Sequence, residues 1–124
     1  MVEQPTQFVR RAYDAWNWYG VDHLEPFLAD DVVLYDWEEL ADAGVWRGRE
    51  AVVARLEDVG SRVGGGWVEL HDVREVEDGV RVEMEWKLDS GADEAGVSLG
   101  DLCHVVGLEG EKIASIRVVL RHEE

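Results

Sequence analysis

The chain has 124 residues, 46% of them hydrophobic, and a formal net charge of −16 at pH 7. This length predicts one domain over residues 1–124, and the hydrophobic content with six tryptophans excludes a disordered chain. The acidic balance excludes non-specific binding to nucleic acid or to anionic membranes, because both require a basic surface.

Targeting and redox features are few. Cys103 is the single cysteine and cannot form an internal disulfide. The first residues, MVEQPTQFVRR, contain no apolar signal core, and no apolar run reaches the length of a membrane span. We therefore expect a cytoplasmic protein.

Two helices are predicted at the start of the chain. Pro5 suits a first helical turn, and Gly20 ends the helix. Asp22, with Glu25 three residues later, has the pattern of a capping box for a second, short helix that runs to Leu28. Apolar residues recur at helical spacing in the first helix: Phe8, Val9, Ala12, Trp16 and Tyr19.

The stretch 28–53 combines several signals. An apolar strand is predicted from Val32 to about Trp37, and it carries Asp36 near its end. An acidic loop follows, and Trp46 to Glu50 begins a third helix that continues until the glycine triplet 64–66. A carboxylate where a buried strand meets a loop suits the mouth of a small-molecule pocket.

The second half is predicted to be four strands joined by hairpins, at 67–76, 80–88, 97–108 and 113–120. Residues 80–88 alternate strictly between apolar and charged, as in a strand with one buried face. The segment 67–76 alternates imperfectly and leaves its register open. Three helices and mostly antiparallel strands predict an α+β fold with the helices on one face of a curved sheet.

Four segments resemble the SnoaL-like branch of the nuclear transport factor 2-like superfamily. They are VRRAYDAWN at 9–17, FLADDVVLYD at 27–36, VWRGREAV at 45–52, and the final hairpin CHVVGLEGEKIASIRVVLRHEE. The resemblance implies a cone-shaped barrel with three N-terminal helices and a central cavity, and commonly a homodimer. Its relatives include ketosteroid isomerases, polyketide cyclases, dehydratases and non-catalytic binding proteins, so the fold alone does not assign a function.

The resemblance also implies site residues. Asp36 matches the strand aspartate that serves as general base in ketosteroid isomerase. The positions of that enzyme's tyrosine and protonated acid are Ala12 and Cys103 here, with Tyr13 one residue away on the helix. Asp101 shares the face of Cys103 and is a second carboxylate that could enter the cavity.

Other candidate residues depend on strand register. If Trp67, Glu69 and His71 face the cavity, the glutamate and histidine form an acid–base cluster near Asp36; if Val68 and Leu70 face it, both are surface residues. His104 alternates with Cys103, which suggests the convex face. Four tryptophans are candidates for an aromatic pocket lining: Trp16, Trp46, Trp67 and Trp86.

We therefore predict a domain that binds a small hydrophobic molecule. The candidate catalytic residues are Asp36, His71 and Asp101, and the candidate ligand-binding residues are Glu69 and the four tryptophans. The chemistry would be acid–base isomerisation, cyclisation or dehydration without a cofactor. No metal site is expected, because the four histidines are scattered. The alternative is a non-catalytic ligand-binding or dimerisation module.

Overall fold

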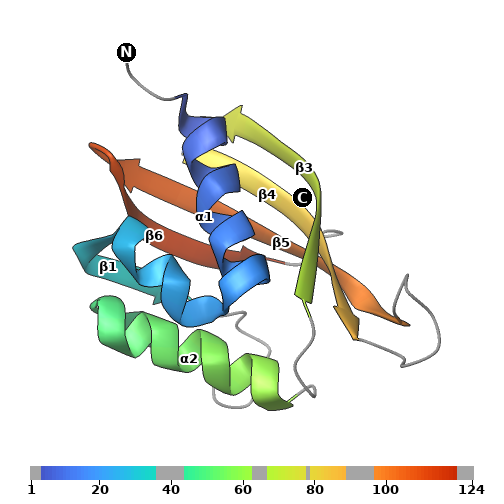
Figure 1. Ribbon diagram of the computed structural model, residues 1–124. Coiled ribbons are helices and arrows are strands. Elements are labelled where there is room, and N and C mark those ends of the chain that lie inside the picture. Colours follow the sequence, from blue (N-terminus) through green and yellow to red (C-terminus); the bar gives the residue numbers. More distant parts are fainter. Residues whose placement is uncertain (1–3, 36–43, 63–66, 78, 89–96, 120–124) are drawn as a thin grey trace.

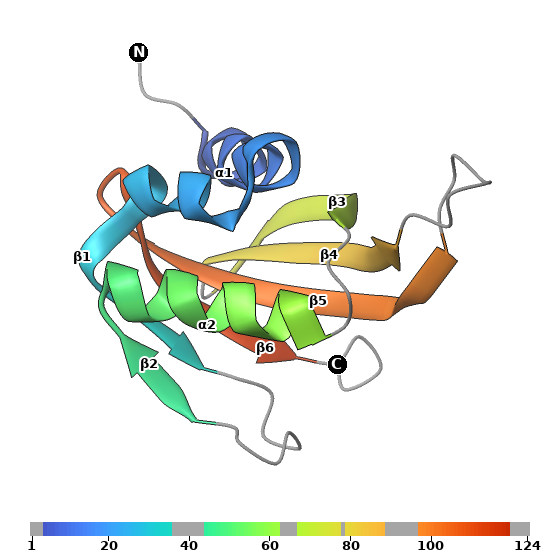
Figure 2. The same ribbon diagram turned by 60° about the horizontal axis from the view of Figure 1, so that its bottom comes forward.

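The computed structural model describes residues 4–35, 44–62, 67–77, 79–88 and 97–119. Within these ranges, three helices and six strands follow one another in the order α1, η1, β1, β2, α2, β3, β4, β5, β6. The helices cover one face of a curved sheet (Figures 1 and 2). This face is called the inner face below, and the opposite one the outer face.

The two N-terminal helices lie close to where the sequence predicts them. Helix α1 spans Pro5–Tyr19, and Gly20 ends it with a φ of 108°. The second element, Val21–Phe27, is a 3-10 helix (η1), and no side chain caps its first turn. The capping box predicted at Asp22 is therefore not formed, and Gly20 occupies the cap position instead.

Strand β1 and the segment after it differ from the prediction. Strand β1 covers Leu28–Tyr35, so it begins four residues before Val32. Trp46 lies in a short strand, β2 (Val45–Arg47), rather than in the helix, and α2 runs over Arg49–Arg62. Gly48, with a φ of 91°, makes the turn between them. Asp36 lies outside the described residues.

The C-terminal strands agree closely with the prediction. They are β3 (Trp67–Val76), β4 (Gly79–Leu88), β5 (Val97–Glu109) and β6 (Lys112–Val119). The sheet order is β2-β1-β6-β5-β4-β3; β1 pairs with β6 in parallel and all other neighbours are antiparallel. The predicted α+β fold is confirmed, with an open sheet, while the central cavity stays a prediction.

The core lies between the inner face and the helices. Val9, Ala12 and Tyr13 of α1 are fully buried, and α1 packs on β3 and β4 while α2 packs on β1 and η1. From the sheet, Leu34, Val82, Met84, Val106 and Ile116 enter the same core. Each such side chain contributes about 1.5–3 kcal/mol through the removal of its apolar surface from water. In the described part of the chain, no helix is long and apolar enough to cross a membrane.

Candidate functional site

The registers of the central strands decide which side chains face the helices. Val82 pairs with His104, and Met84 pairs with Leu102. Since Val82 and Met84 belong to the buried core, His104 faces the helices with them. The suggestion that His104 lies on the convex face was therefore wrong.

His104 forms a buried hydrogen bond with helix α1. Its Nδ1 lies 2.7 Å from the hydroxyl of Tyr13, and the two residues are 2% and 0% exposed. Burial lowers the pKa of His104 to about 4, and burial, with the nearby Cys103, raises the pKa of the Tyr13 phenol above its usual range. Both groups are neutral near pH 7, and each can give or accept a proton in a hydrogen bond.

The ring of Trp16 packs against both members of this pair. Trp16 stacks on the His104 ring, with centroids 6.5 Å apart and an angle of 18° between the planes. Trp16 also meets Trp86 edge-on at 6.3 Å, and Tyr13 at 5.6 Å. Trp16 and Trp86 are half-buried, so the cluster extends from the core toward the surface.

A buried arginine approaches Trp46 from helix α2. The guanidinium carbon of Arg55 lies 4.3 Å from the ring centroid of Trp46, and the residue is only 5% exposed. Its Nη1 also lies 3.4 Å from a carboxylate oxygen of Asp58. A planar guanidinium stacks readily on an indole ring, so this contact positions Trp46 against the core.

Asn17 joins helix α1 to the exposed edge of the sheet. Its amide nitrogen donates to the carbonyl of Val68 at 2.6 Å, and its amide oxygen accepts from the Val68 N–H at 3.1 Å. Val68 lies on β3, an edge strand. The Asn17 side chain thus makes the hydrogen bonds that a further strand would make with this edge. It also holds α1 in a fixed position over β3 and over Trp86, the cross-strand partner of Val68.

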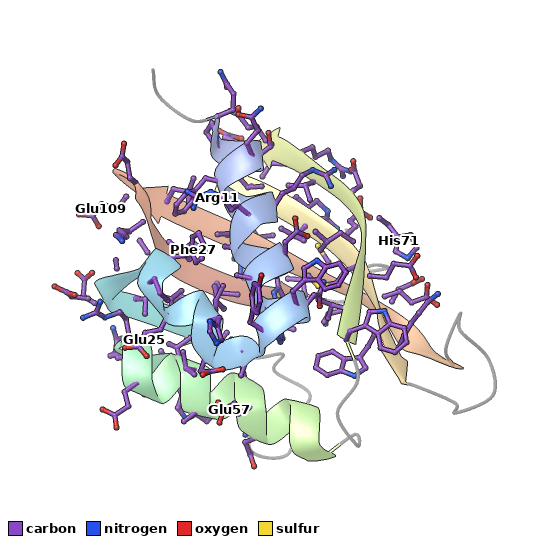
Figure 3. All side chains as sticks on the ribbon, viewed as in Figure 1. Arg11, Glu25, Phe27, Glu57, His71 and Glu109 are labelled. Atoms are coloured by element: carbon purple, nitrogen blue, oxygen red, sulfur yellow. The ribbon has the colours of Figure 1, made fainter. Side chains whose placement is uncertain are left out.

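Four of the predicted site residues lie on the outer face. Val68 is buried, while Glu69 and His71 are exposed. Of the two registers considered for this strand, the structure therefore has the one that places Glu69 and His71 on the surface. Figure 3 shows His71 on the side of β3 away from α1. Asp101 is exposed opposite Glu85, and Trp67 pairs with Lys87 on the same outer face. The structure does not bring these four to the Tyr13–His104 pair.

The sequence matches a family model over most of its length. The model describes a SnoaL-like domain, and the match covers residues 9–116. The chain belongs to the SnoaL-like domain family. No curated protein matches this SnoaL-like domain.

Solved structures agree with this SnoaL-like assignment at the level of fold. A hypothetical protein with a ketosteroid isomerase-like fold from Catenulispora acidiphila, in complex with trimethylamine, is 16% identical, with a TM-score of 0.70 and 94% and 86% of the two chains covered. TerC, co-crystallized with polyporic acid, is 14% identical, with a TM-score of 0.73 and coverages of 97% and 94%. An NTF2-like protein of unknown function from Burkholderia pseudomallei is 16% identical, with a TM-score of 0.73 and coverages of 98% and 94%. These identities establish a shared fold and no more.

Sequence reasoning missed three parts of this SnoaL-like site. It noted Tyr13 only as a neighbour of the expected position Ala12, whereas both residues are buried and the tyrosine carries the polar contact. It passed over Asn17 and Arg55, which look like ordinary polar helix residues. A signal for Arg55 was present, since position 55 lies three residues after Val52 and one before Leu56, on the apolar stripe of α2.

Proposed function

We propose that this SnoaL-like domain binds a small hydrophobic molecule between its helices and the inner face of the sheet. The observation that carries the proposal is the buried hydrogen bond between Tyr13 and His104 next to the half-buried ring of Trp16, which in turn meets the half-buried ring of Trp86. Apolar sites with a few polar groups are typical of ligand pockets. The complexes of the two relatives with trimethylamine and polyporic acid lend support, since both are small molecules.

Any reaction in this proposal is acid–base isomerisation, cyclisation or dehydration. A neutral tyrosine hydroxyl and a neutral imidazole can each donate a hydrogen bond that stabilises a developing oxyanion. Asp36, the general base implied by the family resemblance, remains the proposed carboxylate. His71 and Asp101 have no part in this version of the site, because they lie on the outer face.

Tryptophan substitutions test the binding site. A panel of apolar aromatic and alicyclic molecules is screened by thermal shift, and each hit is titrated by tryptophan fluorescence. We expect Trp86→Leu to weaken binding by about tenfold or more, since large aromatic groups dominate such contacts. The control Trp18→Leu removes an indole that is 80% exposed on α1 and should bind like the wild type. Equal affinities for all three proteins would overturn the inner-face site.

Asp36→Asn separates catalysis from binding. For any hit that is also turned over, this variant should lose turnover while its binding and melting temperature stay close to wild type. Binding with unchanged turnover would remove Asp36 from the mechanism. If the variant changed only its stability, Asp36 would have a structural role.

A second candidate function is a non-catalytic interaction module. Tyr13 and His104 are satisfied by each other and covered by Trp16, which is also what a filled core looks like. The same ligand screen decides between the two. Native mass spectrometry that finds the purified protein without a retained small molecule, together with a panel that gives no thermal shift, would favour the module.

We also propose a homodimer formed through the outer face. A hollow of about 300 Å³ on that face is lined by one aromatic, one aliphatic and one basic side chain beside two small residues: Tyr35, Val105, Arg117, Gly107 and Ser115. Tyr35 is 41% exposed, and Cys103 is fully buried nearby on the same face. A mixed surface of this kind suits a contact between two copies.

A further inference from the structure

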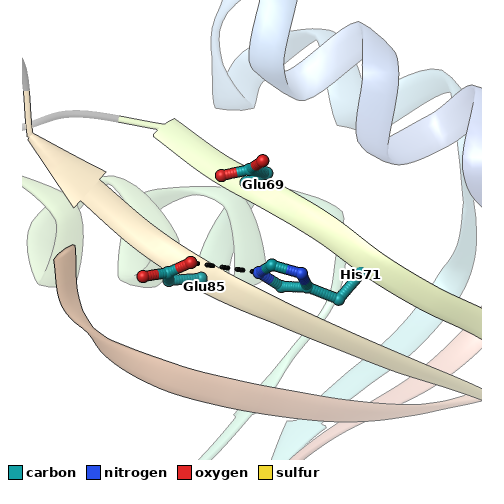
Figure 4. Close-up of side chains that lie close together, drawn as sticks. All are labelled: Glu69, His71 and Glu85. Carbon is teal, nitrogen blue, oxygen red and sulfur yellow. Dashed lines mark hydrogen bonds and ion pairs between the residues drawn. The ribbon is translucent and has the colours of Figure 1, made fainter. Parts of the chain in front are cut away.

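A histidine and two glutamates converge on the outer face of β3 and β4. Glu69 and Glu85 are direct cross-strand partners, and His71 follows Glu69 by two residues, which puts it on the same face (Figure 4). Their side chains are 46%, 20% and 42% exposed for Glu69, Glu85 and His71, so solvent reaches the group. The β3–β4 pairing fixes the backbones of Glu69 and Glu85, and His71 lies where the register of β3 shifts between Leu70 and Asp72.

The distances suit one ion. His71 Nε2 lies 3.1 Å from Glu85 Oε1, and one ligand atom from each of the three residues lies within 4.8 Å of the others. Ligand bonds to Zn²⁺ are about 2.0–2.2 Å, so two atoms on one ion lie roughly 3–4 Å apart. Small rotations of the exposed side chains would bring the three ligand atoms from within 4.8 Å of one another to this shorter spacing. In the part of the chain that the structure describes, no other set of three such residues converges in this way.

The charge arrangement favours a cation at this point. Glu69 faces Glu85 across one strand pair, and Glu85 faces Asp101 across the next, so three carboxylates lie in a row across β3, β4 and β5. Like charges directly opposite one another destabilise a sheet. Lys87 offsets part of this repulsion, with its ammonium nitrogen 2.5 Å from a Glu69 oxygen. A divalent cation offers twice the charge and can contact both glutamates at once.

We propose that Glu69, His71 and Glu85 form a binding site for a first-row divalent transition metal, with Zn²⁺ as the reference ion. The imidazole is the reason for this choice, since Mg²⁺ and Ca²⁺ prefer sites made of oxygen alone. Metal binding displaces Lys87 from Glu69, and water completes the coordination. The site lies on the face opposite the Tyr13–His104 pair and does not depend on the function proposed for that pair.

The test uses the full chain without a histidine tag, titrated with ZnCl₂ by calorimetry and with CoCl₂ by visible absorption. We expect one saturable site and d–d absorption bands from bound Co²⁺. His71→Gln and Glu85→Gln should each weaken Zn²⁺ binding at least about tenfold. Loss of a residue that only hydrogen-bonds to a metal ligand already lowers metal affinity by about that factor, and loss of the ligand itself should lower it at least as much. Lys87→Met should tighten binding, since it removes the competing ammonium group.

His23→Gln is the matched control. His23 is also exposed and lies 4.0 Å from a carboxylate of Asp22, but no third ligand among the described residues joins it. This variant should bind Zn²⁺ like the wild type. The proposal is overturned if His23→Gln loses as much affinity as His71→Gln, or if neither variant changes it, because binding would then be a general property of the acidic surface. Displacement of Co²⁺ by an equimolar amount of Mg²⁺ would overturn the choice of metal class.

Discussion

At the scale of single residues, the Tyr13–His104 hydrogen bond makes a stability contribution that can be measured. Tyr13→Phe removes the hydroxyl and leaves His104 Nδ1 buried without that partner. The expected loss is about 1–3 kcal/mol in the free energy of unfolding, from urea denaturation. Tyr19→Phe is the control, since Tyr19 is 72% exposed, and it should change stability by less than about 0.5 kcal/mol. Equal effects would show that the buried hydrogen bond is not stabilising.

His104 also predicts how stability depends on pH. Its pKa in the folded chain is about 4, below the ordinary value of 6.5, so the unfolded chain binds the proton more readily. The stability that the folded chain gains by keeping His104 neutral is fully present above about pH 6.5. It is lost as the pH falls toward 4. With about 1.36 kcal/mol for each unit of pKa, the loss is on the order of 3 kcal/mol.

The measurement compares unfolding free energies from pH 7 to pH 4. His104→Gln should show a flatter curve than the wild type over this range, because the substituted side chain does not titrate. His23→Gln is measured alongside it as a control for the removal of a histidine from an exposed position. A His104 imidazole that titrates near pH 6.5 by NMR would contradict the predicted burial of the neutral form.

At the scale of elements, Asn17 is predicted to tie α1 to β3. Asn17→Ala leaves both backbone groups of Val68 without their amide partner, at a cost of about 1–3 kcal/mol. Hydrogen exchange should accelerate at the Val68 amide more than at amides of β5, a central strand. Asp14→Ala, an exposed position on the same helix, is the control and should leave Val68 exchange unchanged.

Gly79 has a packing role that its place in a hairpin conceals. Its φ is 146°, and a Cβ atom added there would lie 2.1 Å from the carbonyl oxygen of Val106. Gly79→Ala must therefore push β4 away from β5, and we expect a loss of about 1–3 kcal/mol in thermal or urea unfolding. Gly110→Ala meets no atom within 4 Å and carries only the strain of its φ of 61°, about 1 kcal/mol. A larger effect at Gly110 would contradict this reading.

The same elements show what sequence patterns could and could not predict. The strict alternation over 80–88 specified β4 and its inner residues, including Val82 and Met84, because a strand has a period of two. Strand β3 was ambiguous because its register shifts between Leu70 and Asp72, so one alternation pattern cannot describe all of it. A three-residue strand such as β2 is too short to leave a periodic signal.

The site was harder to predict than the fold. His104 and Cys103 are neighbours on β5, and both side chains are buried. Even a correct prediction that both are buried would not have shown which of the two side chains faces the helices. On α1, both Ala12 and Tyr13 are buried, and only the three-dimensional packing shows that the hydroxyl reaches β5. The convergence of Glu69, His71 and Glu85 depends on the β3–β4 register, which connects residues 14 or more positions apart.

At the scale of the whole molecule, the proposed homodimer must form against strong repulsion. Each chain carries a net charge of −16, so two chains repel at low ionic strength. Salt screens the repulsion between charges that are farther apart than about 10 Å at 0.1 M ionic strength, or about 3 Å at 1 M. The dimer dissociation constant should therefore fall as NaCl rises, which sedimentation equilibrium can measure. An interface held by direct ion pairs would show the opposite trend.

The outer-face location gives this prediction its second test. Tyr35→Glu places a carboxylate beside the hollow that includes Val105 and Arg117, and it should shift the protein to monomer at every salt concentration. Val76→Glu makes the same change at the end of the edge strand β3, where the side chain is 36% exposed, and should leave the association unchanged. Circular dichroism must show both variants folded. If both variants remain dimeric, the two copies meet through a surface other than the outer face around Tyr35, and if neither they nor the wild type associate, the domain acts as a monomer.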